Sequence, residues 1–190
     1  MIANNACGIH SVLAQWHTHL QQWGHFSVGT LQGGSDDKAD VLHQAKHGRL
    51  EIVLMSYDMM RRFDVALRDV HWHVAVFDEF HVLKNPKSAA TTCARMLSVD
   101  FRLGLTGTPI QNNLEELWCL LNVLAPRKFA DKKQWKDHFS NPIKRAQKKS
   151  AAEEAVARGR QRQQELQRLL NTYMLRRSKA VIEHELKGKD

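Results

Sequence analysis

Two acidic residues at the end of a short apolar run are the first candidates for chemistry in this sequence. The run Val74-Ala-Val-Phe77 leads directly into Asp78 and Glu79, and His81 follows two residues later. If the run is a strand of an open α/β sheet, both acids lie at its carboxyl edge, where such folds bind ligands. Asp78 could then hold a hydrated Mg²⁺, and Glu79 could orient and deprotonate the attacking water in nucleotide hydrolysis. Taken alone, the dipeptide favours a simpler explanation, an acidic turn that opens a loop.

A second polar loop makes the hydrolytic explanation the stronger one. The apolar run Arg102-Leu-Gly-Leu-Thr106 continues into Gly107-Thr108-Pro109, and Gln111 lies two residues beyond. A glycine between two hydroxyl residues, with a proline that sets the next turn, forms a stiff loop. Its side chains could sense whether a γ-phosphate is present beside the acids. The stretch from Leu105 to Trp118 is too long and too specific in its residue types to be a chance combination of loop residues.

These two loops need a scaffold that brings them together. Apolar runs predict strands at 51–57, 74–77 and 102–106, and helical patterns lie at 58–69, 87–97 and 113–124. Strands that alternate with helices predict βαβ units and a parallel sheet that is covered on both faces. Earlier in the chain we expect a turn-rich loop at 29–40 and an amphipathic helix at 11–23, with Val12, Leu13, Trp16, Leu20 and Trp23 at helical spacing.

Positive charge is concentrated in the last third of the chain. Residues 1–125 hold 10 Lys or Arg against 12 Asp or Glu, a net charge of 10 − 12 = −2. Residues 126–190 hold 18 against 8, a net charge of 18 − 8 = +10, and strand patterns vanish there, which predicts a basic α-helical extension. Such a block suggests a polyanion nearby, most often nucleic acid. A solvated helical surface without a ligand is the simpler alternative.

Several other classes of protein are disfavoured by what the sequence lacks. It contains no run of about 18 apolar residues that could cross a membrane. Its first ten residues lack the basic and apolar regions of a signal peptide. The three cysteines, Cys7, Cys93 and Cys119, are far apart and lack zinc-site spacing, so neither a disulfide framework nor a structural metal is expected. A reducing compartment, the cytosol or nucleus, fits this cysteine usage.

In combination, these motifs resemble the first ATPase lobe of the Swi/Snf-type, superfamily-two, helicase-like DNA translocases. Asp78-Glu-Phe-His81 resembles motif II of that family, and Leu105–Asn113 resembles motif III. Ser11-Val-Leu-Ala-Gln-Trp16 is similar to the end of motif Ia, and Ile52–Asp58 to the segment that faces DNA. Phe129–Lys179 resembles the helical protrusion and the end of the lobe. The long basic insert favours the repair-type branch, similar to Cockayne syndrome group B translocases.

The resemblance implies a role for each matching residue. The implied catalytic residues are Asp78, Glu79 and His81, with Asp78 holding Mg²⁺ through water and Glu79 as the base. The implied ATP-binding and coupling residues are Asp78, Glu79, Thr106, Gly107, Thr108 and Gln111. The implied DNA contacts are Ser56, Tyr57, Lys84, Arg176 and Arg177, although the two arginines could instead cap the last helix. ATP and Mg²⁺ are therefore the implied cofactors, and double-stranded DNA is the implied partner.

The sequence departs from the family at two points. No G-x-x-x-x-G-K-[ST] loop is present: Gly29–Gly34 has two glycines at the right separation, but Ser35-Asp36 follows them in place of Lys-Ser/Thr. No apolar strand is expected to lead into this loop, and it comes after the motif Ia match. Without the P-loop strand we expect a sheet that lacks its middle and exposes apolar edges. Phe80 stands where the family has a small residue, and packing under the adjacent loop would accommodate it.

The expected organisation is an unmatched segment at 1–10, a RecA-like ATPase lobe without its P-loop at 11–125, and a basic helical protrusion with the end of the lobe at 126–190. We expect part of a nuclear, ATP-dependent translocase on double-stranded DNA that acts in chromatin remodelling or repair, with nucleosomes or repair and transcription proteins as further partners. The full-length protein would add a second ATPase lobe, and the chain alone is expected to hydrolyse little or no ATP. The alternatives are a non-catalytic DNA- or protein-binding fragment that regulates a full-length remodeller, and an unstable fragment.

Overall fold

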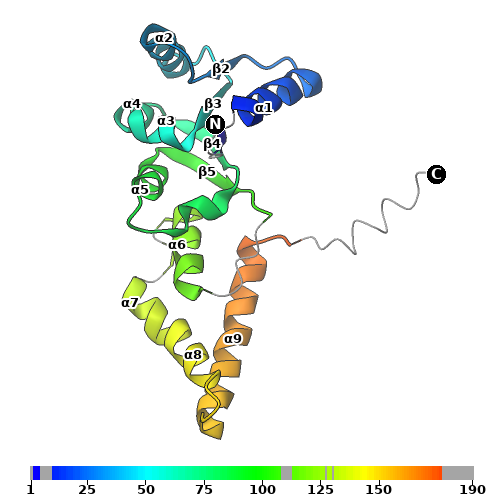
Figure 1. Ribbon diagram of the computed structural model, residues 1–190, viewed down its shortest axis with the longest axis vertical. Coiled ribbons are helices and arrows are strands. Elements are labelled where there is room, and N and C mark those ends of the chain that lie inside the picture. Colours follow the sequence, from blue (N-terminus) through cyan, green and yellow to red (C-terminus); the bar gives the residue numbers. More distant parts are fainter. Residues whose placement is uncertain (1, 5–9, 108–112, 127, 130, 177–190) are drawn as a thin grey trace, which may run out of the picture. The chain divides into compact units, whose positions relative to one another are not determined.

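The computed structural model describes residues 2–4, 10–107, 113–126, 128–129 and 131–176. The chain divides into two compact units, residues 1–130 and 131–190 (Figure 1). The first unit is built on a five-stranded sheet in the order β2-β3-β1-β4-β5, and its ladders are all parallel. The strands are β1 Ile2–Asn4, β2 Val28–Thr30, β3 Ile52–Ser56, β4 Trp72–Phe77 and β5 Val99–Gly104. The predicted α/β class with a parallel sheet is confirmed.

Helices connect the strands of the first unit, as the alternating pattern predicts. They are α1 His10–Trp23, α2 Ser35–Lys46, α3 Tyr57–Arg62, α4 Asp64–Arg68, the 3₁₀ helix η1 Phe80–Lys84, α5 Ala89–Met96 and α6 Leu114–Leu124. The single helix expected at 58–69 is two helices. They meet at Phe63, whose φ of −108° and ψ of 20° end α3 before α4 begins.

The middle of the sheet is filled, contrary to the expectation from the sequence. Strand β1 lies between β3 and β4, with Ile2 opposite both Leu54 and Val76. The segment at 1–10, which resembles no motif of the family, therefore contributes a central strand. Three residues are too few to show a period-two pattern, which explains why this strand could not be predicted.

The glycine-rich segment at 29–34 begins inside a strand, because β2 spans Val28–Thr30, and it ends where α2 begins at Ser35. The N-terminus of α2 nevertheless does not suit a phosphate. Its first turn carries Asp36 and Asp37, and Asp37 Oδ2 accepts a hydrogen bond from the Gly34 N–H at 3.2 Å. Carboxylates occupy the position where a helix dipole would favour an anion. The structure thus supplies the strand that the sequence did not reveal, while the P-loop assignment remains rejected.

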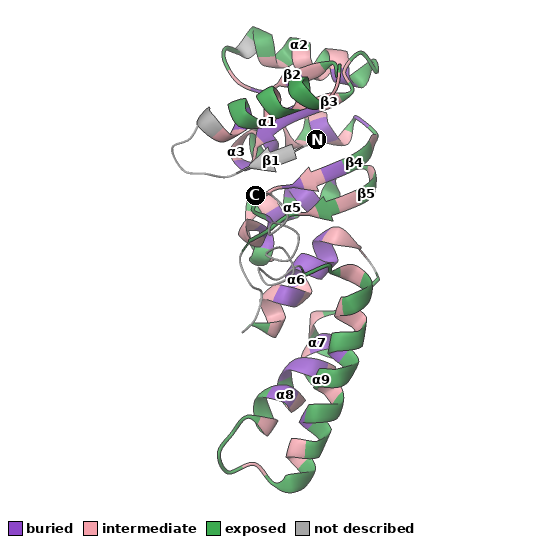
Figure 2. Ribbon diagram, turned by 90° about the vertical axis from the view of Figure 1, so that its right-hand side faces the viewer, coloured by how far each residue is buried: buried purple, intermediate pink, exposed green. Residues whose placement is uncertain are grey.

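The core lies on both faces of this sheet (Figure 2). On one face, inward side chains of β3 and β4 meet the helices in a cluster that includes Val53, Met55, Ala75, Phe77, Met60, Leu67, Ala94 and Leu120. On the other face, Leu13 of α1 is buried against Leu54, with Trp16 and Leu20 packed beside them. Trp23 was expected in the same apolar stripe, but it is 86% exposed because α1 ends there.

Helices are the regular elements of the second unit among its described residues, as predicted for the basic extension. It consists of α7 Lys132–Trp135, the π-helix η2 Lys136–Ser140, α8 Asn141–Ala146 and α9 Glu153–Tyr173. Its buried side chains include Trp135, Phe139, Ile143 and Leu166. None of the described helices in either unit has the length and apolar character needed to cross a membrane.

Two contacts in the second unit fix α9 against its neighbours. Gly159 allows α8 to approach closely, since a Cβ at Gly159 would lie only 2.2 Å from the Ala146 Cβ. The Glu165 carboxylate accepts hydrogen bonds from His138 Nε2 at 2.8 Å and from Arg162 Nη1 at 2.6 Å. These bonds, with the His138 bond as the larger cause, hold the pKa of Glu165 below its usual range.

Candidate functional site

Asp78 follows directly on β4 and is held from three directions. Trp16 Nε1 on α1 donates a hydrogen bond to Asp78 Oδ2 at 3.1 Å, and the Glu79 N–H donates to Oδ1 at 2.9 Å. The Tyr57 hydroxyl at the start of α3 donates to the Asp78 carbonyl oxygen at 2.9 Å. Both the carboxylate and the backbone of Asp78 are therefore fixed. Trp16 lies 62 residues away in sequence, so nothing in the spacing of the residues indicates this bond.

Glu79 adopts a backbone conformation that is rare for its residue type. Its φ of 48° and ψ of 48° lie in the left-handed region, and no other non-glycine among the described residues has a positive φ. Such a conformation costs on the order of 1–3 kcal/mol and persists only where the surrounding structure enforces it. Strain of this kind is concentrated at functional sites, so the turn after β4 has the character of a site rather than of an ordinary loop.

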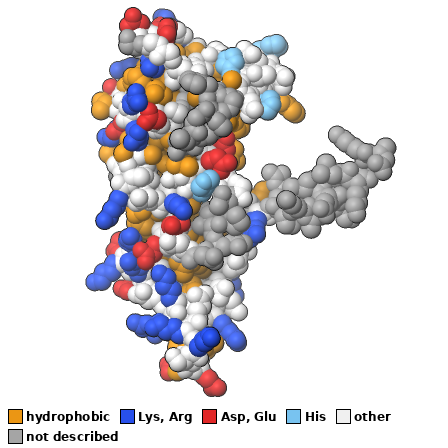
Figure 3. All heavy atoms as spheres, viewed as in Figure 1, with side chains coloured by type: hydrophobic (Ala, Val, Ile, Leu, Met, Phe, Trp, Pro, Cys, Tyr) orange, Lys and Arg blue, Asp and Glu red, His pale blue; other side chains and the backbone are white. Residues whose placement is uncertain are grey.

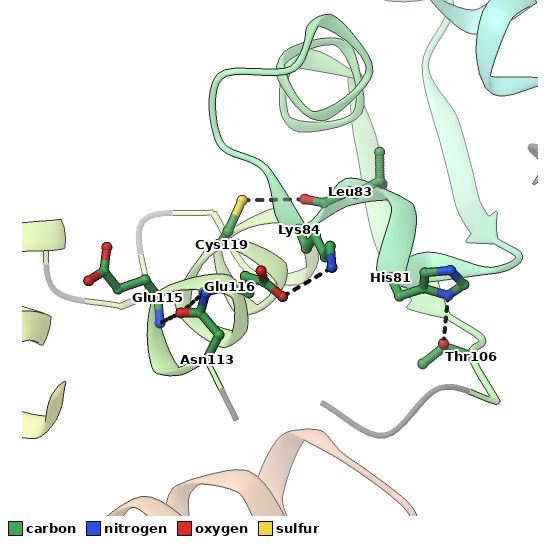
Figure 4. A network of polar contacts seen from close by, with 8 residues as sticks. All are labelled: His81, Leu83, Lys84, Thr106, Asn113, Glu115, Glu116 and Cys119. Carbon is green, nitrogen blue, oxygen red and sulfur yellow. Dashed lines mark hydrogen bonds and ion pairs between the residues drawn. The ribbon is translucent and has the colours of Figure 1, made fainter. Parts of the chain in front are cut away.

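His81 joins the acidic turn to the polar loop after β5. Its Nδ1 lies 3.2 Å from Thr106 Oγ1 (Figure 4). The same Nδ1 lies 3.2 Å from Glu79 Oε2. The contact with Glu79 is an ion pair when His81 is protonated, and the tautomer of the imidazole decides whether Nδ1 or the Thr106 hydroxyl donates the hydrogen bond between them. The structure thus brings together three residues from the two motifs that the sequence singled out.

Backbone hydrogen bonds hold the two loops in register. The Leu105 N–H donates to the Phe77 carbonyl at 2.8 Å, and the Phe80 N–H donates to the Leu105 carbonyl at 2.8 Å. This pairing extends the β4–β5 ladder beyond Gly104 and brings Thr106 level with His81. Gly107 is exposed at the end of the described loop. The predicted site residues Thr108 and Gln111 lie outside the described residues.

Phe80 is accommodated by a glycine on the neighbouring strand. Its ring is buried, and its centroid lies 6.0 Å from that of Phe77. A Cβ at Gly104 of β5 would lie 2.5 Å from the Phe80 ring, so the ring occupies the space that a side chain at Gly104 would take. The expectation that Phe80 packs beneath the adjacent loop agrees with this position. Because the Phe80 ring lies against Gly104, it does not obstruct Asp78 or Glu79.

Tyr57 does not have the position expected of a DNA contact. Its side chain is buried and its hydroxyl is hydrogen-bonded to the Asp78 carbonyl, so it is not available to a phosphate. Burial, followed by the nearby Asp78 and Glu79 carboxylates, raises the pKa of Tyr57 above its usual range. Ser56 caps α3, its Oγ accepting a hydrogen bond from the Met59 N–H at 3.2 Å. The Ser56 hydroxyl hydrogen remains a possible donor to an anion.

Lys84 lies at the end of η1 and is paired with α6. Its Nζ is 3.4 Å from Glu116 Oε2 (Figure 4), and the two side chains are 51% and 36% exposed. An exposed ion pair of this kind contributes little, about 0–1 kcal/mol, so a phosphate could replace the carboxylate. Arg176 is exposed three residues beyond the end of α9, while Arg177 lies outside the described residues.

The residues at this site fit one half of a Mg²⁺–ATP site. Carboxylate oxygens are ligands that Mg²⁺ prefers, and the two Asp78 oxygens keep lone pairs beyond those used by Trp16 and Glu79. No group of three or more His, Cys, Asp or Glu residues in the described part of the chain could hold a metal by itself. The phosphate-binding half has no counterpart, because the sequence contains no G-x-x-x-x-G-K-[ST] loop.

Comparisons with known proteins agree with this geometry. A model of the SNF2-related domain matches residues 9–190. The chain is 33% identical over 180 residues to the mouse DNA excision repair protein ERCC-6-like 2, and 34% identical over 178 residues to the ISWI chromatin-remodeling complex ATPase ISW2 of Saccharomyces cerevisiae. Its fold matches the Sulfolobus solfataricus SWI2/SNF2 ATPase core in complex with dsDNA, with a TM-score of 0.72 and 28% identity.

The chain spans only part of each of these proteins. The matches cover 95% and 93% of this chain, but 12% of the mouse protein and 15% of the yeast protein. The match to the Sulfolobus core covers 95% of this chain and 34% of that chain. The repair protein and the remodelling ATPase are almost equally identical to this chain, so identity alone does not favour the repair-type branch.

Proposed function

The chain belongs to the SNF2-related family, and from this premise we propose that it forms part of the first ATPase lobe of an ATP-dependent translocase on double-stranded DNA. The link from Glu79 through His81 to Thr106 carries the proposal. It connects the acids that would hydrolyse ATP to the loop that would respond to the γ-phosphate. The fold shared with the Sulfolobus ATPase core supports the same assignment.

Each residue of the link has a defined part in the proposed reaction. Asp78 holds Mg²⁺ through water when ATP is bound, and its orientation is set by Trp16. Glu79 orients and deprotonates the attacking water. His81 transmits the state of the turn to Thr106 through the contacts of its Nδ1 with both residues. The P-loop and second lobe that complete such a site are not in this sequence, so the 190-residue chain alone is expected to hydrolyse little or no ATP.

A chimera tests the proposed reaction. The segment of the Sulfolobus SWI2/SNF2 ATPase core that aligns with this chain is replaced by residues 9–190, and DNA-stimulated phosphate release is measured. We expect hydrolysis, and we expect Glu79→Gln to lower it by about 10²–10⁴-fold, the range for loss of a general base. Nucleotide binding should remain, because Glu79 is not expected to hold the phosphates.

The matched control is Glu154→Gln, which makes the same chemical change at an exposed position of α9. Its activity should stay within about twofold of the chimera, since surface substitutions away from such features have small effects. Rapid hydrolysis by the Glu79→Gln chimera would contradict the role of Glu79. A folded chimera that binds DNA and ATP but never hydrolyses would contradict the assignment of the whole segment.

A second candidate function is non-catalytic binding of duplex DNA, which could regulate a full-length remodeller. The missing P-loop favours it for the isolated chain, and so does the surface of the second unit. Exposed basic side chains there include Lys133, Lys144, Arg145, Lys148, Lys149, Arg158, Arg160 and Arg168 (Figure 3). Phosphate contacts by such residues release counterions and make binding depend steeply on salt.

A salt titration with duplex DNA tests this second candidate. Reversing Lys144, Arg145, Lys148 and Lys149 to Glu should weaken binding, and the slope of log K against log salt should fall by about 0.9 for each phosphate that the variant no longer neutralises. The control reverses Lys38, Lys46, Arg49 and Arg95 of the first unit and so changes the net charge equally. If both variants weaken binding equally, net charge alone attracts the DNA.

The family assignment also leads to proposals about the location and the partners of the protein. We propose a nuclear protein whose partners include nucleosomes or repair and transcription proteins, since the relatives with shared sequence are named as repair and chromatin-remodelling proteins. Fluorescence microscopy of the tagged chain tests the location, and a cytosolic signal that excludes the nucleus would contradict it.

A further inference from the structure

The turn that joins α8 to α9 carries a serine whose hydroxyl makes no hydrogen bond. Residues 147–152 lie outside both helices, and Figure 2 shows most of this turn as exposed. Ser150 is exposed within it, and its side chain has no hydrogen-bond partner among the described residues. The other exposed serines and threonines that the structure describes each form a side-chain hydrogen bond, namely Thr18, Ser27, Thr92, Ser98, Thr106 and Thr172. Within the described part of the chain, Ser150 is therefore the one exposed serine or threonine with a free hydroxyl.

Capping of α9 would be the simpler role for this serine, because Ser150-Ala-Ala-Glu153 has the spacing of a capping box. The structure does not use it in this way. Helix α9 begins at Glu153, its N-cap is Ala152, and no side-chain hydrogen bond caps it. The Ala151 N–H donates to the Lys148 carbonyl at 3.0 Å, which closes a turn with Ser150 as its third residue. The backbone alone holds this turn, so the hydroxyl is not needed for the fold.

Two lysines precede Ser150 in the same turn. Lys148 and Lys149 are exposed, and neither is paired with a carboxylate among the described residues. Glu153 and Glu154 follow the serine, but they belong to the first turn of α9. An enzyme that binds an irregular segment would therefore meet the two lysines without unfolding a helix. To bind the two glutamates in the same way it would have to unwind the start of α9.

We propose that Ser150 is a phosphorylation site for a serine kinase that selects basic residues on the amino-terminal side of its target. In this reaction the Ser150 oxygen forms a bond to the γ-phosphorus of ATP, the bond from that phosphorus to the β–γ bridging oxygen breaks, and ADP leaves. The hydroxyl proton passes to the catalytic base of the kinase. The exposed turn between α8 and α9 suits this reaction, because modifying enzymes need the same access that makes loop tips the preferred sites of proteolysis.

A phosphate at Ser150 would cancel the positive charge around it. Residues 144–154 hold four Lys or Arg and two Glu, a net charge of 4 − 2 = +2. A phosphoserine adds about −2 at pH 7, so the segment becomes neutral. Phosphorylation then weakens the binding of DNA, and this consequence rests on the proposed binding of duplex DNA by the second unit. If two phosphate contacts are lost, the slope of log K against log salt should fall by about 1.8.

Mass spectrometry of the full chain after incubation with ATP and a basic-directed serine kinase tests the modification. We expect a phosphate that peptide mapping places at Ser150. Replacing Lys148 and Lys149 by alanine should slow its addition at least about tenfold, because charge patterns determine which substrates such enzymes select. Replacing Glu153 and Glu154 by glutamine is the matched control on the other side of the serine and should leave the rate within about twofold. A folded chain without phosphate at Ser150, or equal slowing by both double variants, would overturn the proposal.

A titration with duplex DNA tests the consequence of the modification. The kinase-treated Ser150→Ala chain is the control, because it carries any phosphate that is added elsewhere. The phosphorylated parent should bind DNA roughly 10–100-fold more weakly than this control at about 0.1 M salt. Equal affinity of the two chains would refute the effect on DNA. If the untreated chain does not bind DNA, the proposed DNA binding fails and its regulation with it, whereas the mass measurement still decides whether Ser150 is modified.

Discussion

Replacing Gly104 by alanine tests whether a glycine on β5 is what accommodates Phe80 beside Asp78 and Glu79. The new Cβ would lie 2.5 Å from Cδ1, 2.6 Å from Cγ and 3.0 Å from Cε1 of Phe80. An ordinary contact begins near 3.4 Å, so the ring must move by 3.4 − 2.5 = 0.9 Å. Phe80 is only 3% exposed and cannot swing into solvent. Overpacking of this kind costs about 1–3 kcal/mol.

A smaller effect acts in the opposite direction. Alanine is favoured over glycine in a strand by about 0.5–1 kcal/mol, because glycine loses more conformational freedom on folding. The expected net loss for Gly104→Ala is therefore about 0–2.5 kcal/mol, or about 1 kcal/mol from the middle of each range. Urea unfolding of the chain, followed by circular dichroism, measures it. Gly107→Ala is the matched control, since a Cβ at Gly107 meets nothing within 4 Å and should change stability by less than about 0.5 kcal/mol.

The double variant separates the contact from other effects. Phe80→Ala alone should cost about 3–5 kcal/mol because it removes a buried ring. In the Phe80→Ala/Gly104→Ala chain the new methyl group no longer meets the ring, so the combined loss should be smaller than the sum by about 1–3 kcal/mol. Strict additivity of the two losses would refute the idea that Phe80 uses the space at Gly104.

Three further changes follow from contacts elsewhere in the chain. Tyr57→Phe should lower stability by about 1 kcal/mol through loss of a buried hydrogen bond. Because the pKa of Tyr57 is raised in the folded chain, its contribution is fully present below about pH 10 and is lost as the pH rises further, so the urea midpoints of the two chains should stay apart up to about pH 10 and converge above it. Gly159→Ala should destabilise the second unit by about 1–3 kcal/mol, and adding Ala146→Gly should recover part of that loss in thermal melts. The pKa of Glu165 is lowered on folding, so its stabilisation is present above about pH 4.3 and lost in acid; the advantage of the parent over Glu165→Gln at about pH 6 should disappear near about pH 3.

The residues that the sequence placed correctly are those governed by local rules. The order of strands and helices was readable from periodicity, and the carboxyl-edge rule brought Asp78, Glu79 and Thr106 to neighbouring strand ends. The break at Phe63 and the earlier starts of β4 and β5 are boundary errors, which depend on packing rather than on composition. Local patterns were thus enough for the fold class and for the core of the candidate site.

The residues that the sequence misplaced depend on tertiary contacts. Tyr57 occurs in a segment that resembles a DNA-facing motif, yet its ring turns inward at the start of α3, and no spacing rule indicates that direction. Trp16 looked like one more apolar residue of an amphipathic helix, while its indole N–H in fact reaches Asp78. Both side chains are aromatic with a single polar group, and that group usually forms a hydrogen bond when the side chain is buried. Sequence patterns treat such side chains as apolar and so miss the bond.

Trp16 and Tyr57 also link two helices to Asp78 through hydrogen bonds. Trp16 is on the helix that resembles motif Ia, and Tyr57 begins the helix after β3, the segment that resembles the DNA-facing motif. Each donates one hydrogen bond to Asp78, one to its carboxylate and one to its carbonyl. A shift of either helix would therefore move the residue proposed to hold Mg²⁺, with no contact between DNA and the acids themselves. These two hydrogen bonds are enough to couple the helices to Asp78, because a packed core transmits small displacements instead of absorbing them.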